Sequence, residues 1–306
     1  MTTTYADLIN EISLNLSGYT LRQDRTTHLT QAIDDSELTL NFGSVTNIGK
    51  GAVEIDDELL WLDTYDRVSN SAVVAPYGRG YYGTTKAAHL INSKVTIAPT
   101  FPRATIKKAI NDTIDAVFPD LFGVGVYTFN FNTVKTTYSL PAEVETILYI
   151  SWKSTGPTEE WIPLRNWRAD PLANSTSFTT GQSVSIYDRV DAGRTVQVYY
   201  TKKSATFSEL ATSTLTNAQV FETVTGLPSS TKDVIVYGAS YRLSSFIDPG
   251  RLNYSSAEAD NADTKIQYGA GASTARFLLA LYQQRVKEES KKLRDVYPTR
   301  IHYTRY

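Results

Sequence analysis

The chain contains no cysteine, and this absence excludes several kinds of chemistry at once. Disulfide bonds, thiol catalysis and thiolate metal ligation all require the cysteine sulfur. Histidine is also scarce: His28, His89 and His302 are the only three, with no short spacing between any two. A zinc site would therefore need carboxylates for most of its ligands. We expect no metal ion and no cofactor.

Long apolar runs are missing as well. No segment approaches the roughly 20 consecutive apolar residues that span a bilayer. The first residues, Met1 to Tyr5, lack the basic region and apolar core of a secretory signal. With 30 basic and 32 acidic residues the net charge is −2, so a global basic surface for nucleic acid is absent. We expect a protein made in a cytoplasm, without a membrane partner.

What the chain does contain is typical of a folded protein. Its 306 residues suffice for one large domain or two to three small ones, and 41% are hydrophobic. Tyrosine is abundant, at 20 residues against 11 phenylalanines. Tyrosine suits interfaces, because it combines a large contact area with a polar group. It also fills half-buried strand positions, so both explanations stay open.

Apolar residues at helical spacing predict four helices. They cover residues 4–16, Pro102 to Phe118, a segment from Ser229, Ser230 or Thr231 to Phe246, and a segment from about Ser273 to Val296. Isolated helices of this length are marginal in water, so we expect them to pack on one another as a bundle.

Two groups of short β-branched and aromatic segments predict strands. The first covers residues 38–40, 53–55, 59–62, 72–75 and 95–97; the second covers residues 126–131, 136–140, 146–152, 184–187 and 195–200, with a long polar loop from Arg165 to Thr180. Each group predicts a small antiparallel barrel or sandwich.

The predicted fold class is therefore α+β: a four-helix bundle core with two inserted antiparallel β-modules and an extended C-terminal tail. The bundle takes residues 1–19, 101–124 and 228–298, the first β-module residues 20–100, the second β-module residues 125–227, and the tail residues 299–306.

A glycine-rich stretch at Gly78 to Gly83 matches the Gly-x-Gly-x-x-Gly pattern of dinucleotide-binding loops. Its context does not fit: no helix pattern follows, and no acidic residue for a ribose occurs about twenty residues further on. The phosphate-loop pattern would need lysine where Thr84 stands. The stretch instead predicts a glycine-rich β-loop that carries Arg79, Tyr81 and Tyr82 outward.

Acidic residues gather just before this loop. Paired carboxylates can hydrolyse a glycosidic bond or hold a hard cation, but the spacing of a calcium loop is absent. The simpler interpretation is a hairpin turn with solvated acids. The cluster comprises Asp56, Asp57, Glu58, Asp63 and Asp66. No Gly-x-Ser-x-Gly elbow is present, and His89 is expected to pack or to cap. We expect no enzyme activity.

The C-terminal residues form a basic, aromatic segment. Residues 287–306 contain six basic and three acidic side chains. Such a tail can bind a nucleic acid backbone, dock into a groove on a partner protein, or remain a disordered end. The candidate docking residues are Arg300, Ile301, His302, Tyr303, Arg305 and Tyr306.

Several of these features together resemble structural proteins of tailed bacteriophages. The segments that carry the resemblance are Val73 to Ala75, Gly78 to Thr85, Lys86 to His89, Val95 to Pro99 and the helix from Pro102 to Phe118. The last helix, followed by Tyr297-Pro298-Thr299-Arg300, is similar to head-to-tail connector (adaptor) proteins.

The resemblance implies a homo-oligomeric ring, a dodecamer, in the neck of the virion at the head-tail junction. Its implied partners are the portal protein, tail or neck proteins, further copies of itself, and DNA that passes without sequence specificity. The tail at residues 299–306 would dock on the portal, and the loop residues Arg79, Tyr81 and Tyr82 would lie between subunits. Two alternatives remain: a tail-fibre or baseplate-type protein that recognises host glycans, and a polysaccharide hydrolase that uses the acids near Asp56.

Overall fold

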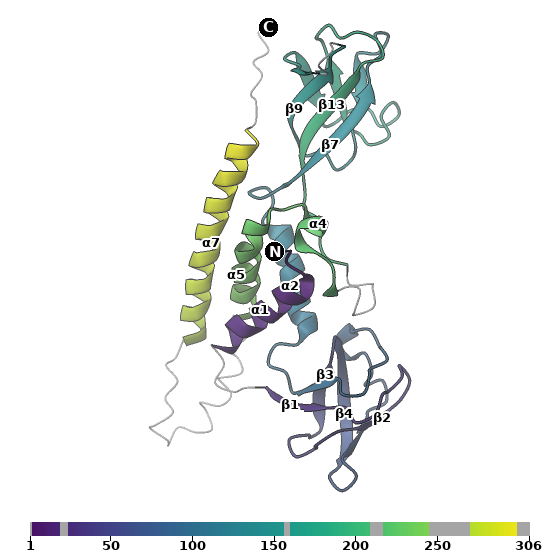
Figure 1. The fold of residues 1–306 in the computed structure, drawn as a ribbon, viewed down its shortest axis with the longest axis vertical. Coiled ribbons are helices and arrows are strands. Elements are labelled where there is room, and N and C mark those ends of the chain that lie inside the picture. Colours follow the sequence, from purple (N-terminus) through teal and green to yellow (C-terminus); the bar gives the residue numbers. More distant parts are fainter. Residues whose placement is uncertain (1, 19–23, 156–159, 209–216, 245–269, 299–306) are drawn as a thin grey trace. The chain divides into compact units, whose positions relative to one another are not determined.

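The computed structural model describes residues 2–18, 24–155, 160–208, 217–244 and 270–298 (Figure 1). The chain forms two compact units. The first unit takes Met1–Thr113, Thr206–Phe221 and Lys232–Gln284, and the second takes Ile114–Ala205, Glu222–Thr231 and Arg285–Tyr306. The helices are α1 (Tyr5–Ser17), α2 (Arg103–Ala116), α4 (Phe221–Thr225), α5 (Lys232–Ser244) and α7 (Ala270–Val296), with 3-10 turns η1 (Tyr81–Gly83) and η2 (Ser229–Thr231).

The first β-module is a six-stranded antiparallel sheet of the order β1-β6-β3-β4-β5-β2. Its strands are β1 (Arg25–His28), β2 (Thr39–Asn41), β3 (Gly51–Ile55), β4 (Glu58–Asp66), β5 (Ser71–Val74) and β6 (Lys94–Ile97). The edges β1 and β2 meet only just beyond their ends, through an isolated bridge between Leu29 and Phe42. The sheet is curved but is not closed, so of the two expected architectures, barrel or sandwich, a closed barrel is not formed.

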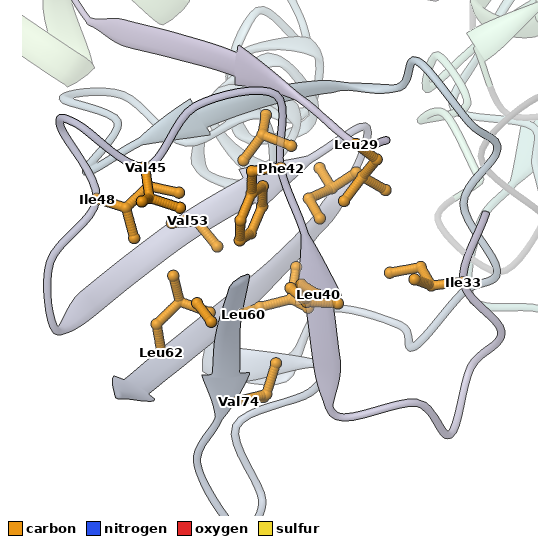
Figure 2. Packing of buried hydrophobic residues seen from close by; sticks show 13 residues of the cluster. Leu29, Ile33, Leu40, Phe42, Val45, Ile48, Val53, Leu60, Leu62 and Val74 are labelled. Atoms are coloured by element: carbon orange, nitrogen blue, oxygen red, sulfur yellow. The ribbon is translucent and has the colours of Figure 1, made fainter. Parts of the chain in front are cut away.

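The core of this module lies on the inner side of the curved sheet (Figure 2). Strand β4 contributes Leu60 and Leu62, which alternate with residues on its outer face as the two-residue strand period requires. Phe42 is 2% exposed and lies among the aliphatic side chains of neighbouring strands (Figure 2). This apolar core anchors the strands from which the candidate site is built.

The second β-module consists of two antiparallel sheets, of the orders β10-β9-β13-β7 and β11-β12-β8. Its strands are β7 (Gly123–Asn130), β8 (Thr137–Ser139), β9 (Thr146–Lys153), β10 (Trp161–Pro163), β11 (Trp167–Asp170), β12 (Ser183–Ile186) and β13 (Thr195–Lys202). Val184 and Ile186 of the smaller sheet share a core with Val196 and Val198 of the larger one. The two sheets thus bury their apolar faces against each other, as sandwich modules do.

Strand β11 lies inside the segment from Arg165 to Thr180, which the sequence predicts to be a loop. The prediction failed because this strand is exposed along most of its length and shows no apolar alternation. The short strands β1 and β10 were missed for the same reason, since their residues are mostly exposed.

Helix α1 begins with a capping box in which Thr4 and Asp7 satisfy each other's backbone N–H groups. Its apolar face is fully buried, and the helix packs along α5, with an ion pair of 2.8 Å between Lys232 and Glu11. Tyr5 stacks on Phe207 at a ring-centroid distance of 4.0 Å. Within the described residues, no helix is both long and apolar enough to cross a membrane.

The expected four-helix bundle is wrong. The boundary between the two compact units falls within α2 and within α7, so these helices are shared between the units instead of enclosing a single core. Helical periodicity shows that one face is buried, but it does not show what covers that face.

Gly238 on α5 allows a close approach between elements of the first unit. A Cβ atom at this position would lie 2.3 Å from the Thr113 methyl group and 2.9 Å from the Tyr282 ring. Tyr241 of the same helix also contacts the Tyr282 ring, at 5.6 Å between centroids. Glycine is therefore required here for packing, although it is a poor helix former.

We predict that Gly238→Ala destabilises the protein by about 1–3 kcal/mol, because overpacking outweighs the better helix propensity of alanine. Urea unfolding followed by circular dichroism measures the change. Gly49→Ala is the matched control, since a Cβ at Gly49 meets no atom within 4 Å. Equal stability of the two variants would contradict the prediction.

Candidate functional site

The glycine-rich loop connects β5 to β6 in the first β-module. After η1, residues 84–93 continue as turns and irregular backbone up to β6. A nucleotide-binding loop needs a helix directly after it, because the helix N-terminus binds the phosphate. The segment after this loop continues to a strand and not to such a helix.

Two glycines of the loop have steric roles. A Cβ at Gly78 would lie 2.6 Å from the Trp61 carbonyl oxygen, and the Gly78 carbonyl accepts a hydrogen bond from the Trp61 N–H. Gly80 has a φ of 64° in the left-handed region, and a Cβ there would lie 2.7 Å from the Thr84 carbonyl oxygen. The glycine pattern thus lets the loop fold closely against β4.

Arg79 is buried, with 4% of its surface exposed. Its Nε and one Nη donate to the two carboxylate oxygens of Glu58, at 2.8 and 2.9 Å. The remaining N–H groups donate to the backbone carbonyls of Asp34, Glu37 and Ala87. All five donors of the guanidinium group are used. The expectation that the loop carries Arg79 outward is wrong, because the buried Glu58 carboxylate needs a countercharge.

Glu58 begins strand β4 and is 1% exposed. Besides Arg79, its carboxylate accepts hydrogen bonds from the backbone N–H groups of Gly80, at 2.9 Å, and Ala87, at 3.1 Å. Burial alone would raise the pKa of Glu58, but the hydrogen bonds from His89, Arg79 and these N–H groups lower it to about 2. The carboxylate is therefore fully ionised at neutral pH.

His89 completes this group, which we call the Glu58–Arg79–His89 cluster. Its ring is buried; Nε2 lies 2.9 Å from Glu58 Oε2, and Nδ1 lies 2.8 Å from Asp56 Oδ2. Two carboxylates are both satisfied only when both ring nitrogens donate, which requires the imidazolium form. Burial opposes this charge, but the hydrogen bonds to Asp56 and Glu58 outweigh it and raise the pKa of His89 above its usual value.

The acidic cluster of the sequence separates into individual structural roles. Asp56 and Glu58 bind His89. Asp57 binds Arg103, Lys107 and Asn217. Asp63 binds Lys50, and Asp66 accepts hydrogen bonds from the Ser69 hydroxyl and the Val68 N–H. The expectation of solvated acids is wrong for Glu58. Over the part of the chain that is described, no group of three His, Asp or Glu side chains could hold a metal ion.

A second polar network ties strand β3 and its turn to the start of α2. Glu54 is 6% exposed and accepts a 2.6 Å hydrogen bond from the Arg103 N–H at the helix N-terminus, where the helix dipole favours a carboxylate. Burial raises the pKa of Glu54 to about 7. Asp57 lies 2.9 Å from Arg103 Nε and 3.0 Å from Lys107 Nζ. No local sequence pattern indicates this network, because its partners lie far apart along the chain.

The outward surface of the loop is aromatic. Tyr82 is 83% exposed and Tyr77 is 96% exposed, and both have left-handed backbone, with φ of 55° and 62°. Tyr81 is half-buried and contacts the rings of Trp61 and Tyr82. Tyr77 was not among the residues singled out in the sequence. The predicted docking residues, Arg300, Ile301, His302, Tyr303, Arg305 and Tyr306, lie outside the described residues.

We predict that Arg79→Met destabilises the first β-module by about 3–5 kcal/mol, because it leaves the Glu58 carboxylate buried without its partner. Urea unfolding measures the loss. Arg67→Met is the matched control: Arg67 is exposed on the same module, so its replacement should cost less than about 0.5 kcal/mol. An Arg79→Met protein as stable as the control would contradict the structural role of the cluster.

The raised pKa of His89 predicts that the module loses stability in alkaline solution. A group with a raised folded pKa stabilises fully below its unfolded value of about 6.5, and this contribution disappears as the pH rises through the folded pKa. Unfolding free energies measured from pH 6 to pH 10 should therefore fall.

His89→Gln should flatten that part of the profile, and His28→Gln, a change at an exposed histidine of the same module, should not. On the acid side, the Glu58 contribution is present above its unfolded pKa of about 4.3 and is lost as the pH falls toward 2. A wild-type profile that stays flat above pH 6 would exclude the charged imidazolium.

A comparison with protein families assigns the chain to one of them. A family model described as SU10 adaptor protein matches residues 84–288, which is more than half of the chain. The match begins within the glycine-rich loop at Thr84 and extends through the second β-module into α7. A search of curated proteins found no match. The chain therefore belongs to the SU10 adaptor protein family, whose members are structural adaptors of bacteriophages.

Proposed function

We propose that this chain is a connector of the phage particle, which forms a homo-oligomeric ring between the portal of the head and the tail and lets DNA pass. Membership of the SU10 adaptor protein family is the observation that carries this proposal. The family is a structural one, which agrees with the prediction that the chain is not an enzyme. It also favours the connector over a tail-fibre or baseplate-type protein that binds glycans.

The side chains that suggested catalysis or nucleotide binding support the same proposal. Arg79 uses every donor within the chain, and the Glu58 carboxylate accepts five hydrogen bonds. Groups engaged in this way are not available to a substrate. The candidate site therefore acts as a support that fixes the shape of the first β-module.

Exposed apolar side chains occur on both β-modules. Tyr77 and Tyr82 project from the first, and Val134 and Leu172 of the second are 88% and 91% exposed. Exposed aromatic and aliphatic groups are typical of surfaces that contact other proteins. We propose that Tyr82 contacts a neighbouring subunit, and that Arg79 serves this contact only by holding the loop.

The C-terminal residues Thr299 to Tyr306 are proposed to dock on the portal. Two arginines and two tyrosines in eight residues provide the side-chain types that most often anchor protein interfaces. Aromatic anchors gain energy from desolvation, whereas the arginines add charge-assisted hydrogen bonds.

We predict that a chain lacking Thr299 to Tyr306 folds normally but no longer binds phage heads that carry the portal. Co-sedimentation with purified tailless heads measures binding, and circular dichroism with thermal unfolding checks the fold. A truncated chain that still joins the heads as well as the full chain does would overturn the docking role.

Two substituted tails serve as controls of equal length. Tyr303→Ser with Tyr306→Ser removes the aromatic anchors, and Arg300→Gln with Arg305→Gln removes the charges. We expect the tyrosine pair to cause the larger loss at physiological salt, because exposed charges are screened there. A loss confined to the arginine variant would point to DNA or an acidic surface instead.

A further inference from the structure

A shallow hollow lies beside the glycine-rich loop in the first β-module. It has a volume of about 370 Å³ and is lined by Asp35, Ser36, Leu38, Tyr77, Arg79 and Lys86. The hollow is open to solvent beside Tyr77 and Leu38, which are 96% and 45% exposed. Small-molecule sites bury most of their ligand, so this open hollow suits a protruding part of another protein better.

The backbone at Tyr77 and Tyr82 supports a role for this surface. Left-handed conformations of bulky residues are rare and cost about 1–3 kcal/mol each. Both φ angles lie in this region, and both rings are almost entirely exposed, so little packing within the chain compensates the strain. Both residues present aromatic rings to solvent, and Tyr77 lines the hollow.

The C-terminal end of strand β4 carries a protruding hairpin tip, residues 67–70. Val68 at this tip is 94% exposed. Asp66 fixes the turn, because its carboxylate accepts hydrogen bonds from the Val68 N–H at 2.9 Å and from the Ser69 hydroxyl at 2.7 Å. The guanidinium group of Arg67 lies over the Tyr65 ring, 5.5 Å from its centroid. A rigid turn thus presents one valine and one arginine.

The hairpin tip lies at the C-terminal end of β4, whereas the apolar wall of the hollow lies beside the middle of this strand. The Leu38 carbonyl accepts a hydrogen bond from the Val74 N–H, and the carbonyl of Gly78, next to Tyr77, accepts one from the Trp61 N–H. Four to five residues of strand at about 3.3 Å each separate this wall from Asp66, the last residue of β4, by roughly 13–17 Å. The tip of one chain therefore does not reach the hollow of the same chain.

We propose that the hairpin tip of one copy of this chain inserts into the hollow of the next copy. Val68 would cover Leu38 and Tyr77, and Arg67 would approach Asp35. Ring assembly from identical subunits needs two different patches that complement each other, which the hairpin tip and the hollow supply. This inference rests on the ring proposed above and assigns the contact that joins its subunits.

The hollow carries one exposed acid, Asp35, and one exposed base, Lys86, and the acid is the group with which Arg67 of the tip can pair. Arg67 forms no ion pair with any carboxylate among the described residues, and Asp35 pairs with no described cation. Both side chains are exposed. An arginine brought to Asp35 would give each of them a partner of opposite charge, in addition to the apolar contact of Val68.

The absence of cysteine allows a direct test. Full-length chains with Val68→Cys and Tyr77→Cys together are oxidised mildly, alone at high concentration and bound to portal-bearing heads. Disulfides need Cα atoms within about 7 Å, so a bond between the two positions must join different copies. We expect a ladder of cross-linked oligomers on a non-reducing gel, with the bond between positions 68 and 77 identified by mass spectrometry.

The control pairs Val134→Cys, at an equally exposed valine of the second β-module, with Tyr77→Cys. The proposal is overturned if the Val68 and Tyr77 pair yields no more product than this control, or if bonds join Val68 only to Val68. Chains that bind heads without the expected bond would exclude this contact and leave the connector function in place. Chains that form the bond but never bind heads would support the contact and contradict the connector function.

A charge exchange gives an independent measurement. Asp35→Arg should lower the yield of the 68–77 bond about two- to fivefold, as expected for an exposed ion pair, and adding Arg67→Asp should restore it. Asp191→Arg, at an exposed aspartate of the second β-module, is the control and should change nothing. Failure of the second exchange to restore the yield would exclude the contact between Arg67 and Asp35.

Discussion

Burial of the Glu58 carboxylate is the constraint on which the first β-module depends. A buried carboxylate without partners costs several kcal/mol, so the chain must surround it with donors. Arg79, His89 and the N–H groups of Gly80 and Ala87 provide them, and all four come from the same loop. The loop must fold back tightly onto β4 to deliver them, and its glycines make that path sterically possible. The resemblance to a dinucleotide-binding loop follows from this requirement.

Carboxylates paired with cations or with a helix N-terminus also connect the sheet to helix α2. Glu54 and Asp57, from β3 and the turn after it, meet the N-terminal turn of α2 through Arg103 and Lys107. The four carboxylates within residues 54–58 thus bind the loop through Asp56 and Glu58 and the helix through Glu54 and Asp57. A run of acids that suggested hydrolysis or cation binding instead joins three segments of the fold, because each carboxylate faces a cation or a helix N-terminus.

The sequence predicted the elements better than their contacts. Helical spacing located α1, α2 and α7, and β-branched runs located strands such as β4 and β13, because these patterns are local. Strand β11 escaped, since its exposed residues show no alternation. Arg79 was misjudged because a charged residue in a glycine-rich loop is normally solvated, and its partner Glu58 lies 21 residues away. Tyr77 gave no signal, because strain is a property of the backbone and not of residue type.

The buried Glu58–Arg79–His89 cluster and the exposed tyrosines of the glycine-rich loop depend on each other. Contact residues bind more strongly when they are already held in the bound conformation, because less conformational entropy is lost on association. The ionic cluster provides this order before any partner arrives, since its hydrogen bonds fix the residues between Gly78 and His89 at several points. Tyr77 and Tyr82 then remain on the surface in strained conformations that a loop without the cluster would relax. In the proposed assembly the buried charges would act without touching a partner, because they maintain the shape of the surface that is proposed to contact it.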